Sequence, residues 1–160
     1  GGSTSTYTFW PGGTTVDLHT VGFTKHSAEE FFGLLIGAGV TRLIDVRLRN
    51  VSQLAGFAKR DDLKFFLRKL CDADYVHQPL LAPSQELLDS YKKDLISWDE
   101  YEIRFLELMA TRKIENEVGA DLFEGTPVLL CSEHSPERCH RRLVGEYLND
   151  RWGDVQMLHL

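Results

Sequence analysis

The densest group of chemically capable residues lies between positions 131 and 142, in the order Cys-Ser-Glu-His-Ser-Pro-Glu-Arg-Cys-His-Arg-Arg. Cysteine can act as a nucleophile, glutamate or histidine can transfer protons, and arginine can hold an anion. We therefore take Cys131, Glu133 and His140 as candidate catalytic residues, and Arg141 and Arg142 as candidate substrate-binding residues. The alternative is structural, with a hydrogen-bonded histidine and packed thiols.

Several known types of site fit this group poorly. Thiol phosphatases need a shorter spacing than the one between Cys131 and Arg138, and they need glycines in the loop. Two cysteines and two histidines would suffice for zinc by count, yet the adjacent Cys139 and His140 would point about 100° apart on a helix. We expect no metal and no cofactor. We also expect Cys131 and Cys139 to be free thiols, although a disulfide stays open if their Cα atoms come within about 7 Å.

A second group of candidates follows the earlier strands of the expected sheet. Asp45 is a candidate catalytic residue that could orient a substrate or accept a proton, and Arg47 could bind an anion through two hydrogen bonds. His77 could bind substrate and exchange a proton near neutral pH. A purely structural link between Asp45 and Arg47 is the alternative. Phe57 beside Lys59 could stack on a substrate ring or simply anchor its loop.

The elements that must position these residues alternate short β-rich runs with longer helical patterns, which is typical of a parallel sheet covered by helices. Strands are expected over 16–21, 41–46, 74–77, 127–131 and 155–160, and helices over 28–37, from 61 or 62 to 70, 84–93, 99–117 and 136–149. This pattern predicts an α/β fold, a single-domain three-layer sandwich with a mostly parallel sheet of about five strands and helices on both faces. The domain would cover 16–160, after a flexible leader over 1–15 whose first two glycines are typical of a cloning remnant.

Three local signals refine this prediction. Ser27 and Glu30 form a capping-box pattern at the first helix, and Ser135 with Pro136 marks the start of the last one. Free N–H groups at that last start would favour an anion. The nearly continuous apolar run over 127–131 predicts a central strand. Because the carboxyl ends of parallel strands share one edge, we expect both groups of candidates to converge in one pocket there.

Composition limits the choice of partner. The 160 residues include 18 basic and 24 acidic ones, and the net charge of −6 disfavours indiscriminate binding along nucleic acid. Eight of the basic residues, against three acidic ones, fall within 41–70, and we expect them to contact a polyanion only if they share a face with the pocket. No apolar run approaches the ~18 residues of a membrane helix. The odd count of three cysteines, without a secretion signal, indicates a cytoplasmic protein.

The closing pattern, Cys131-Ser132-Glu133 followed by Cys139-His140-Arg141, resembles the DUF488 family. Weaker matches occur in the family's order at Thr20-Val21-Gly22, Ile44-Asp45-Val46-Arg47, Gly56-Phe57 and Tyr75-Val76-His77-Gln78-Pro79. The resemblance spans 16–160 and implies the fold and the place of the site, while the family's activity is not established in general. Two departures affect the site. Phe23 stands where the family usually has histidine, and Ala82-Pro83 replaces a glycine pair.

We therefore expect a small enzyme, a hydrolase or transferase, that acts on an anionic, nucleotide-like or nucleic-acid substrate. The rival interpretation is a non-catalytic module that uses the same helix start to bind a phosphate ligand, nucleic acid or protein. A partner of either kind would be an anionic small molecule or nucleic acid, with no membrane involved.

Overall fold

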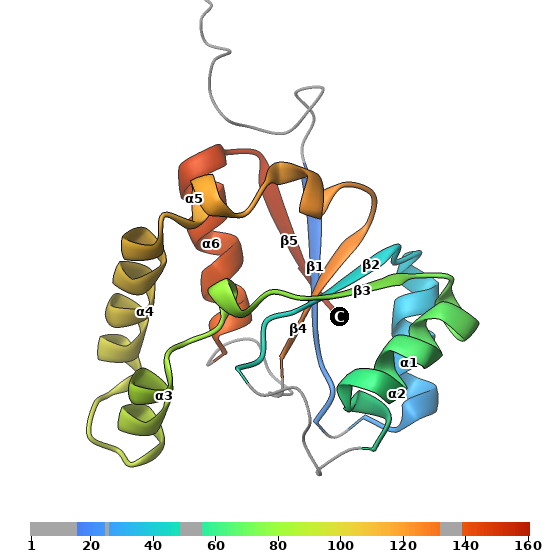
Figure 1. Cartoon of the computed structure of the whole chain (residues 1–160), viewed down its shortest axis with the longest axis horizontal. Helices are drawn as coiled ribbons and strands as arrows, with labels where there is room; N and C mark the ends of the chain where they lie inside the picture. The colour runs from blue at the N-terminus through green and yellow to red at the C-terminus, as the bar shows by residue number, and fades with distance from the viewer. Residues whose placement is uncertain (1–15, 25, 49–55, 132–138) are drawn as a thin grey trace, which may run out of the picture.

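The computed structural model describes residues 16–24, 26–48, 56–131 and 139–160, which build one five-stranded sheet between two layers of helices (Figure 1). The strands are β1 (Val16–Gly22), β2 (Arg42–Asp45), β3 (Asp74–His77), β4 (Pro127–Cys131) and β5 (Val155–His159). Their order across the sheet is β3-β2-β4-β1-β5, and every described pair is parallel. The predicted α/β fold is thus confirmed, with a sheet that is wholly parallel within the described residues.

The apolar run of β4 occupies the centre of the sheet, as predicted. Every residue of this strand is buried, because helices cover both of its faces. Val128 and Leu130 pack in one core layer, whereas Leu129 and Cys131 pack in the other. The alternation of side chains along β4 therefore gives each face of the sheet its own core.

The two helical layers are unequal in size. Helices α1 (Ala28–Ala38) and α2 (Arg60–Phe66) cover one face, and Figure 1 shows α3 (Gln85–Lys92), α4 (Trp98–Arg112), α5 (Ile114–Glu117) and α6 (His140–Trp152) on the other. Short turns of helix, η3 (Gly56–Ala58), η5 (Pro79–Leu81) and η6 (Ala120–Phe123), link these elements. Within the described ranges no helix is both long enough and apolar enough to span a bilayer.

The first helix begins and ends as its sequence predicts. The Ser27 hydroxyl accepts from the backbone N–H of Glu30, and the Glu30 carboxylate accepts from the backbone N–H of Ser27. Gly39 ends the helix in the left-handed region, with φ of 69°. This reciprocal cap fixes where the chain leaves β1 and enters the layer over β4.

Three helix boundaries differ from the predicted ones. α2 begins at Arg60 after Lys59, which makes no side-chain cap, and it continues as the π-helical turn η4 (Leu67–Cys71). The single helix expected over 99–117 is divided at Lys113, whose φ of 54° interrupts α4 before α5. α6 begins at His140, because Cys139 is extended, with φ of −137° and ψ of 139°. The predicted start at Ser135 and Pro136 lies outside the described residues, but no helix runs unbroken from there through Cys139.

A close approach of α6 to the sheet depends on Gly145. A Cβ atom at this position would lie 2.3 Å from Sδ and 2.9 Å from Cγ of Met157 on β5. Both distances are shorter than a van der Waals contact, so glycine allows α6 to lie against β5. This approach is part of the packing of the helix that carries His140 and Arg141.

Candidate functional site

The predicted site residues lie at the carboxyl edge of the sheet but divide between its two faces. Ile44 and Val46 pack in the core under α6, so Asp45 between them points toward α1 and α2. Cys131 packs in the core under α6, although its strand pairs with β2 and Leu130 lies opposite Asp45. The expectation of one shared pocket is therefore corrected: the sheet separates Asp45 and Arg47 from Cys131 and its neighbours.

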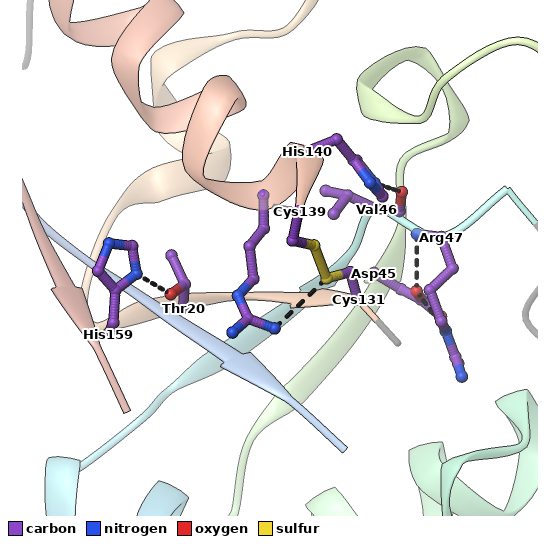
Figure 2. The surroundings of a disulfide bond; sticks show 9 residues. Thr20, Asp45, Val46, Arg47, Cys131, Cys139, His140 and His159 are labelled. Carbon is purple, nitrogen blue, oxygen red and sulfur yellow. Dashed lines mark hydrogen bonds and ion pairs between the residues drawn. A yellow bond between two sulfur atoms is a disulfide. The ribbon is translucent and has the colours of Figure 1, made fainter. Parts of the chain in front are cut away.

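On the α6 face the two sulfur atoms of Cys131 and Cys139 are joined as a disulfide (Figure 2). Both residues are buried, one at the end of β4 and the other at the residue before α6. This pairing corrects the prediction of free thiols, which rested on a reducing compartment and on an apolar core large enough to need no disulfide. Cys71, at the end of η4, is a free cysteine, and burial raises the pKa of its thiol.

Arg141 lies directly beside this sulfur pair. Its guanidinium is fully buried, and Nη1 donates to Sγ of Cys131 over 3.4 Å. A second polar contact is found on the same face, where the hydroxyl of buried Thr20 and Nδ1 of exposed His159 are hydrogen-bonded (Figure 2). These groups, together with the disulfide, form what we call the sulfur cluster: Thr20, Cys131, Cys139, Arg141 and His159.

His140 connects α6 to the end of β2. Nε2 of its partly buried ring donates to the carbonyl oxygen of Val46 over 2.6 Å, and its ring centroid lies 5.6 Å from that of Phe105. Desolvation lowers the pKa of His140 to about 4, and the charge of Arg141 acts in the same direction. The opposing influences, the bond to Val46 and the charge of Asp45, are smaller than the desolvation. The imidazole is therefore neutral near pH 7 and holds the helix start against the sheet.

The opposite face carries a buried ion pair between Asp45 and Arg47. Nε and Nη2 of Arg47 donate to the two carboxylate oxygens of Asp45, each over 2.8 Å, and the backbone N–H of Arg47 donates to Oδ1 over 3.1 Å. The hydroxyl of Tyr75 donates to Oδ2 of Asp45 over 2.5 Å. This geometry fits the structural interpretation, in which the pair ties the strand end to the chain that follows it.

Two further contacts fix Arg47 in place. Nε2 of His77 lies 2.9 Å from the carbonyl oxygen of Arg47, and the Phe23 ring centroid lies 5.4 Å from the guanidinium carbon. Nη1 of Arg47 is buried and has no hydrogen-bond partner among the described residues. We call Phe23, Asp45, Arg47, Tyr75 and His77 the carboxylate cluster. Phe23, one of the two departures from the family pattern, thus packs on this arginine.

The other predicted residues lie apart from both clusters. Arg142 forms ion pairs with Glu102 and Glu146, which occupy its guanidinium. Phe57 packs against the rings of Phe31 and Phe32, as an anchor for its loop would. Lys59 precedes α2, and Glu133 lies outside the described residues. Within the described parts of the chain, no three His, Cys, Asp or Glu side chains gather as a metal site requires.

Apart from Arg47, three of the basic residues of 41–70 gather at the end of the sheet away from both clusters. Arg42, Lys64 and Arg68 line a cavity of about 410 Å³ together with Asp72 and Asp74. Arg42 and Asp74 are the first residues of β2 and β3, so this cavity lies at the amino ends of the strands. We expected polyanion binding only if the basic residues shared a face with the pocket, and these three residues do not.

The sequence interpretation missed three contacts, made by four residues, that complete the clusters. The place of Tyr75 could have been inferred from strand register. Tyr75 lies on β3 opposite Leu43, two residues before His77, which lies opposite Asp45. Thr20 and His159 are also partners across neighbouring strands, in β1 and β5. Aligning the strands in register would have found these residues, whereas the contact of Phe23 with Arg47 depends on the path of the chain after β1.

The family model described as "Domain of unknown function DUF488" matches residues 27–148. The chain belongs to the DUF488 family. No curated protein and no solved structure matches it. The matched range of this DUF488 domain begins just before α1 and ends within α6, so it contains the sulfur pair, Arg141 and the buried ion pair. β1 and β5, which supply Thr20 and His159, lie outside that range.

Proposed function

We propose that this DUF488 domain is a thiol-dependent enzyme that acts on a small anionic substrate, with Cys131 as the nucleophile. The proposal rests on one observation, the contact of 3.4 Å between Nη1 of Arg141 and Sγ of Cys131 at the end of the central strand. A neighbouring arginine favours the thiolate form of cysteine, and the thiolate is the form that attacks electrophiles. Arg141 would thus activate Cys131 whenever the sulfur pair is reduced.

The burial of Arg141 supports this role. A fully buried guanidinium loses much of its hydration, and a neutral sulfur is only a weak hydrogen-bond acceptor. When Cys131 is a thiolate, the same contact becomes an ion pair, and each charge offsets part of the desolvation of the other. The arrangement therefore favours the reactive state of the sulfur over its neutral state.

The start of α6 supports an anionic substrate. Its first turn carries no acidic residue, whereas α1, α3 and α4 all carry at least one there. His140 is followed at once by Arg141, whose buried positive charge lies at the positive end of the helix dipole, whereas the charge of Arg142 is paired with Glu102 and Glu146. A bound anion would relieve this repulsion, and open parallel sheets bind ligands at this edge.

Proton transfer in this proposal falls to Glu133 and not to His140. A histidine with a pKa of about 4 is neutral near pH 7, so it has no imidazolium proton to give, and it is too weak a base to hold a proton taken from the substrate. Its bond to Val46 instead fixes the start of α6 and thereby the place of Arg141. Glu133 follows Cys131 by two positions and remains our candidate general acid or base.

The rate of alkylation as a function of pH tests the proposal. With Cys71 and Cys139 both replaced by serine, Cys131 is the single thiol. The rate of its reaction with iodoacetamide should reach half of its maximum at a pH well below about 8.5, the ordinary pKa of cysteine. Arg141→Met should raise that midpoint by at least about one pH unit, and Arg141→Lys by less, because lysine keeps the charge. An unchanged midpoint in a folded Arg141→Met protein would contradict the proposal.

A matched control is available in the same chain. With Cys131 and Cys139 replaced, Cys71 is the single thiol, and its raised pKa should shift alkylation to a higher pH.

Comparing the rates of reaction with iodoacetate and with iodoacetamide tests the preference of the site for anions. The ratio of the two rates should be several-fold higher at Cys131 than at Cys71, and Arg141→Met should remove the difference. Equal ratios at the two cysteines would favour a neutral substrate.

A further inference from the structure

We infer that Cys139 is the resolving thiol of Cys131, and that the substrates of this site are anionic disulfides that it reduces by two electrons. The inference rests on the proposed function, since it needs Cys131 as the attacking thiolate. It adds the partner, the class of reaction and the product. The disulfide between Cys131 and Cys139 is then the oxidised state of a catalytic pair.

The placement of the two sulfur atoms carries this inference. Cys131 ends a strand and Cys139 precedes a helix, and each is tied to the fold by its own element. They are eight positions apart in the chain, yet their sulfur atoms meet at the carboxyl edge of the sheet. A thiol held this close to another can displace a group from it without any encounter in solution, which makes the second step intramolecular.

Arg141 makes the two cysteines unequal. Nη1 of its guanidinium donates to Sγ of Cys131 over 3.4 Å, so its charge favours Cys131 as the thiolate. In thiol–disulfide exchange the sulfur that is the better thiolate attacks first, and it is also the better leaving group later. The structure therefore assigns the attack to Cys131 and the resolution to Cys139.

The reaction balances without a metal or a further oxidant. The Cys131 thiolate attacks one sulfur of the substrate R–S–S–R′, forming a Cys131–S–S–R bond while R′–S⁻ leaves. Cys139 then loses its proton to the departing thiolate or to solvent and attacks Sγ of Cys131, forming the internal disulfide while R–S⁻ leaves. Two electrons pass from the cysteine sulfurs to the substrate, and a dithiol reductant must restore the pair for another turnover.

The probe for this inference is 5,5′-dithiobis(2-nitrobenzoate), an anionic aromatic disulfide. In the reduced Cys71→Ser protein it should release about two equivalents of thionitrobenzoate and leave the internal disulfide. Adding Cys139→Ser should reduce the release to about one equivalent and leave a stable adduct, which mass spectrometry would place on Cys131. Cys139→Ala should behave in the same way, so the result does not depend on how the buried serine is tolerated.

A kinetic measurement needs no substitution at the pair. The rate of the first release from the Cys71→Ser protein should be proportional to the probe concentration, and the rate of the second should be independent of it, because Cys139 is already in place.

Release of one equivalent with a lasting adduct, in the proteins with and without Cys139, would overturn the inference and leave the proposed function intact. No release from the folded proteins, against full release after denaturation, would overturn the proposed function itself. An internal disulfide that resists excess dithiothreitol in the folded protein would also overturn the inference, since such a bond would be a structural staple.

Discussion

Arg47 and Arg141 are both buried guanidinium groups, and their surroundings give them different roles. Arg47 meets a carboxylate through two parallel hydrogen bonds, the geometry in which arginine and aspartate neutralise each other. Arg141 contacts a sulfur whose charge depends on its redox and protonation state. Arg47 therefore stabilises the fold in every state of the protein, whereas the surroundings of Arg141 change with the chemistry of Cys131.

Removing the hydroxyl of Tyr75 tests the structural role of the carboxylate cluster. Tyr75→Phe deletes the bond to Oδ2 of Asp45, a bond to a buried charged acceptor, and should lower the free energy of unfolding by about 1–3 kcal/mol. Urea denaturation followed by circular dichroism measures the loss. Because the two groups share this bond, Tyr75→Phe and Asp45→Asn should be less than additive when combined, and full additivity would contradict the assignment.

His140 predicts how stability changes with pH. Its pKa is 6.5 in the unfolded chain and about 4 in the folded one, so the unfolded state binds more protons between these values. The free energy of unfolding should therefore fall by roughly 2–3 kcal/mol as the pH decreases from 6.5 to 4, and this group should contribute little change above about pH 7.5. His140→Gln, which keeps a donor toward Val46, should lack this part of the pH dependence. Identical pH profiles for the variant and the parent protein would show that His140 is not the source.

At the scale of the elements, the sequence predicts strands better than helix starts. All five expected strands are present, and β3 and β4 have the predicted bounds, because short β-branched or apolar runs between turn residues leave few alternatives. The predicted start of the last helix, at Ser135 and Pro136, lies outside the described residues, and the extended backbone of Cys139 places the start of α6 at His140.

The division of the site between two faces also has an element-scale cause. Two residues that end neighbouring parallel strands lie at the same edge of the sheet, but they do not have to lie on the same face. The face depends on side-chain alternation together with strand register, and Asp45 lies opposite Leu130, not Cys131. Register comes from pairing between segments far apart in the chain, so the edge could be predicted from the sequence and the face could not.

Two glycines on different helices test the packing of α6 against β5. Gly33→Ala should stabilise the protein by about 0.5–1 kcal/mol, because the added methyl meets nothing within 4 Å and alanine favours the helix. The same change at Gly145 should not stabilise the protein, because the methyl would overlap Met157 and force its side chain to shift. Thermal unfolding of the two variants measures both effects. A stabilised Gly145→Ala protein would show that α6 does not need this close approach.

For the whole molecule, the distribution of charge argues against nucleic acid as the ligand. The net charge is −6, and Arg42, Lys64 and Arg68 surround a cavity with two aspartates at the end of the sheet away from both clusters. Binding of a labelled single-stranded oligonucleotide, measured by fluorescence anisotropy, should be weak, with log affinity falling by less than about 0.7 per unit of log salt, the value for one phosphate. If log affinity instead falls by about 2 or more per unit of log salt, and if Lys64→Glu and Arg68→Glu abolish this dependence, these residues belong to a nucleic-acid surface.

The central place of β4 has a consequence for synthesis of the chain. β1 and β2 are consecutive strands, yet they are not paired with each other, and β4 pairs with both. A nascent chain that has emerged only through α5 can pair β2 with β3, while both neighbours of β1 are still missing. Until residues 127–131 leave the ribosome, β1 keeps open hydrogen-bonding edges of the kind that chaperones and proteases engage. Truncation before β4 should therefore yield a degraded polypeptide and not a smaller folded domain.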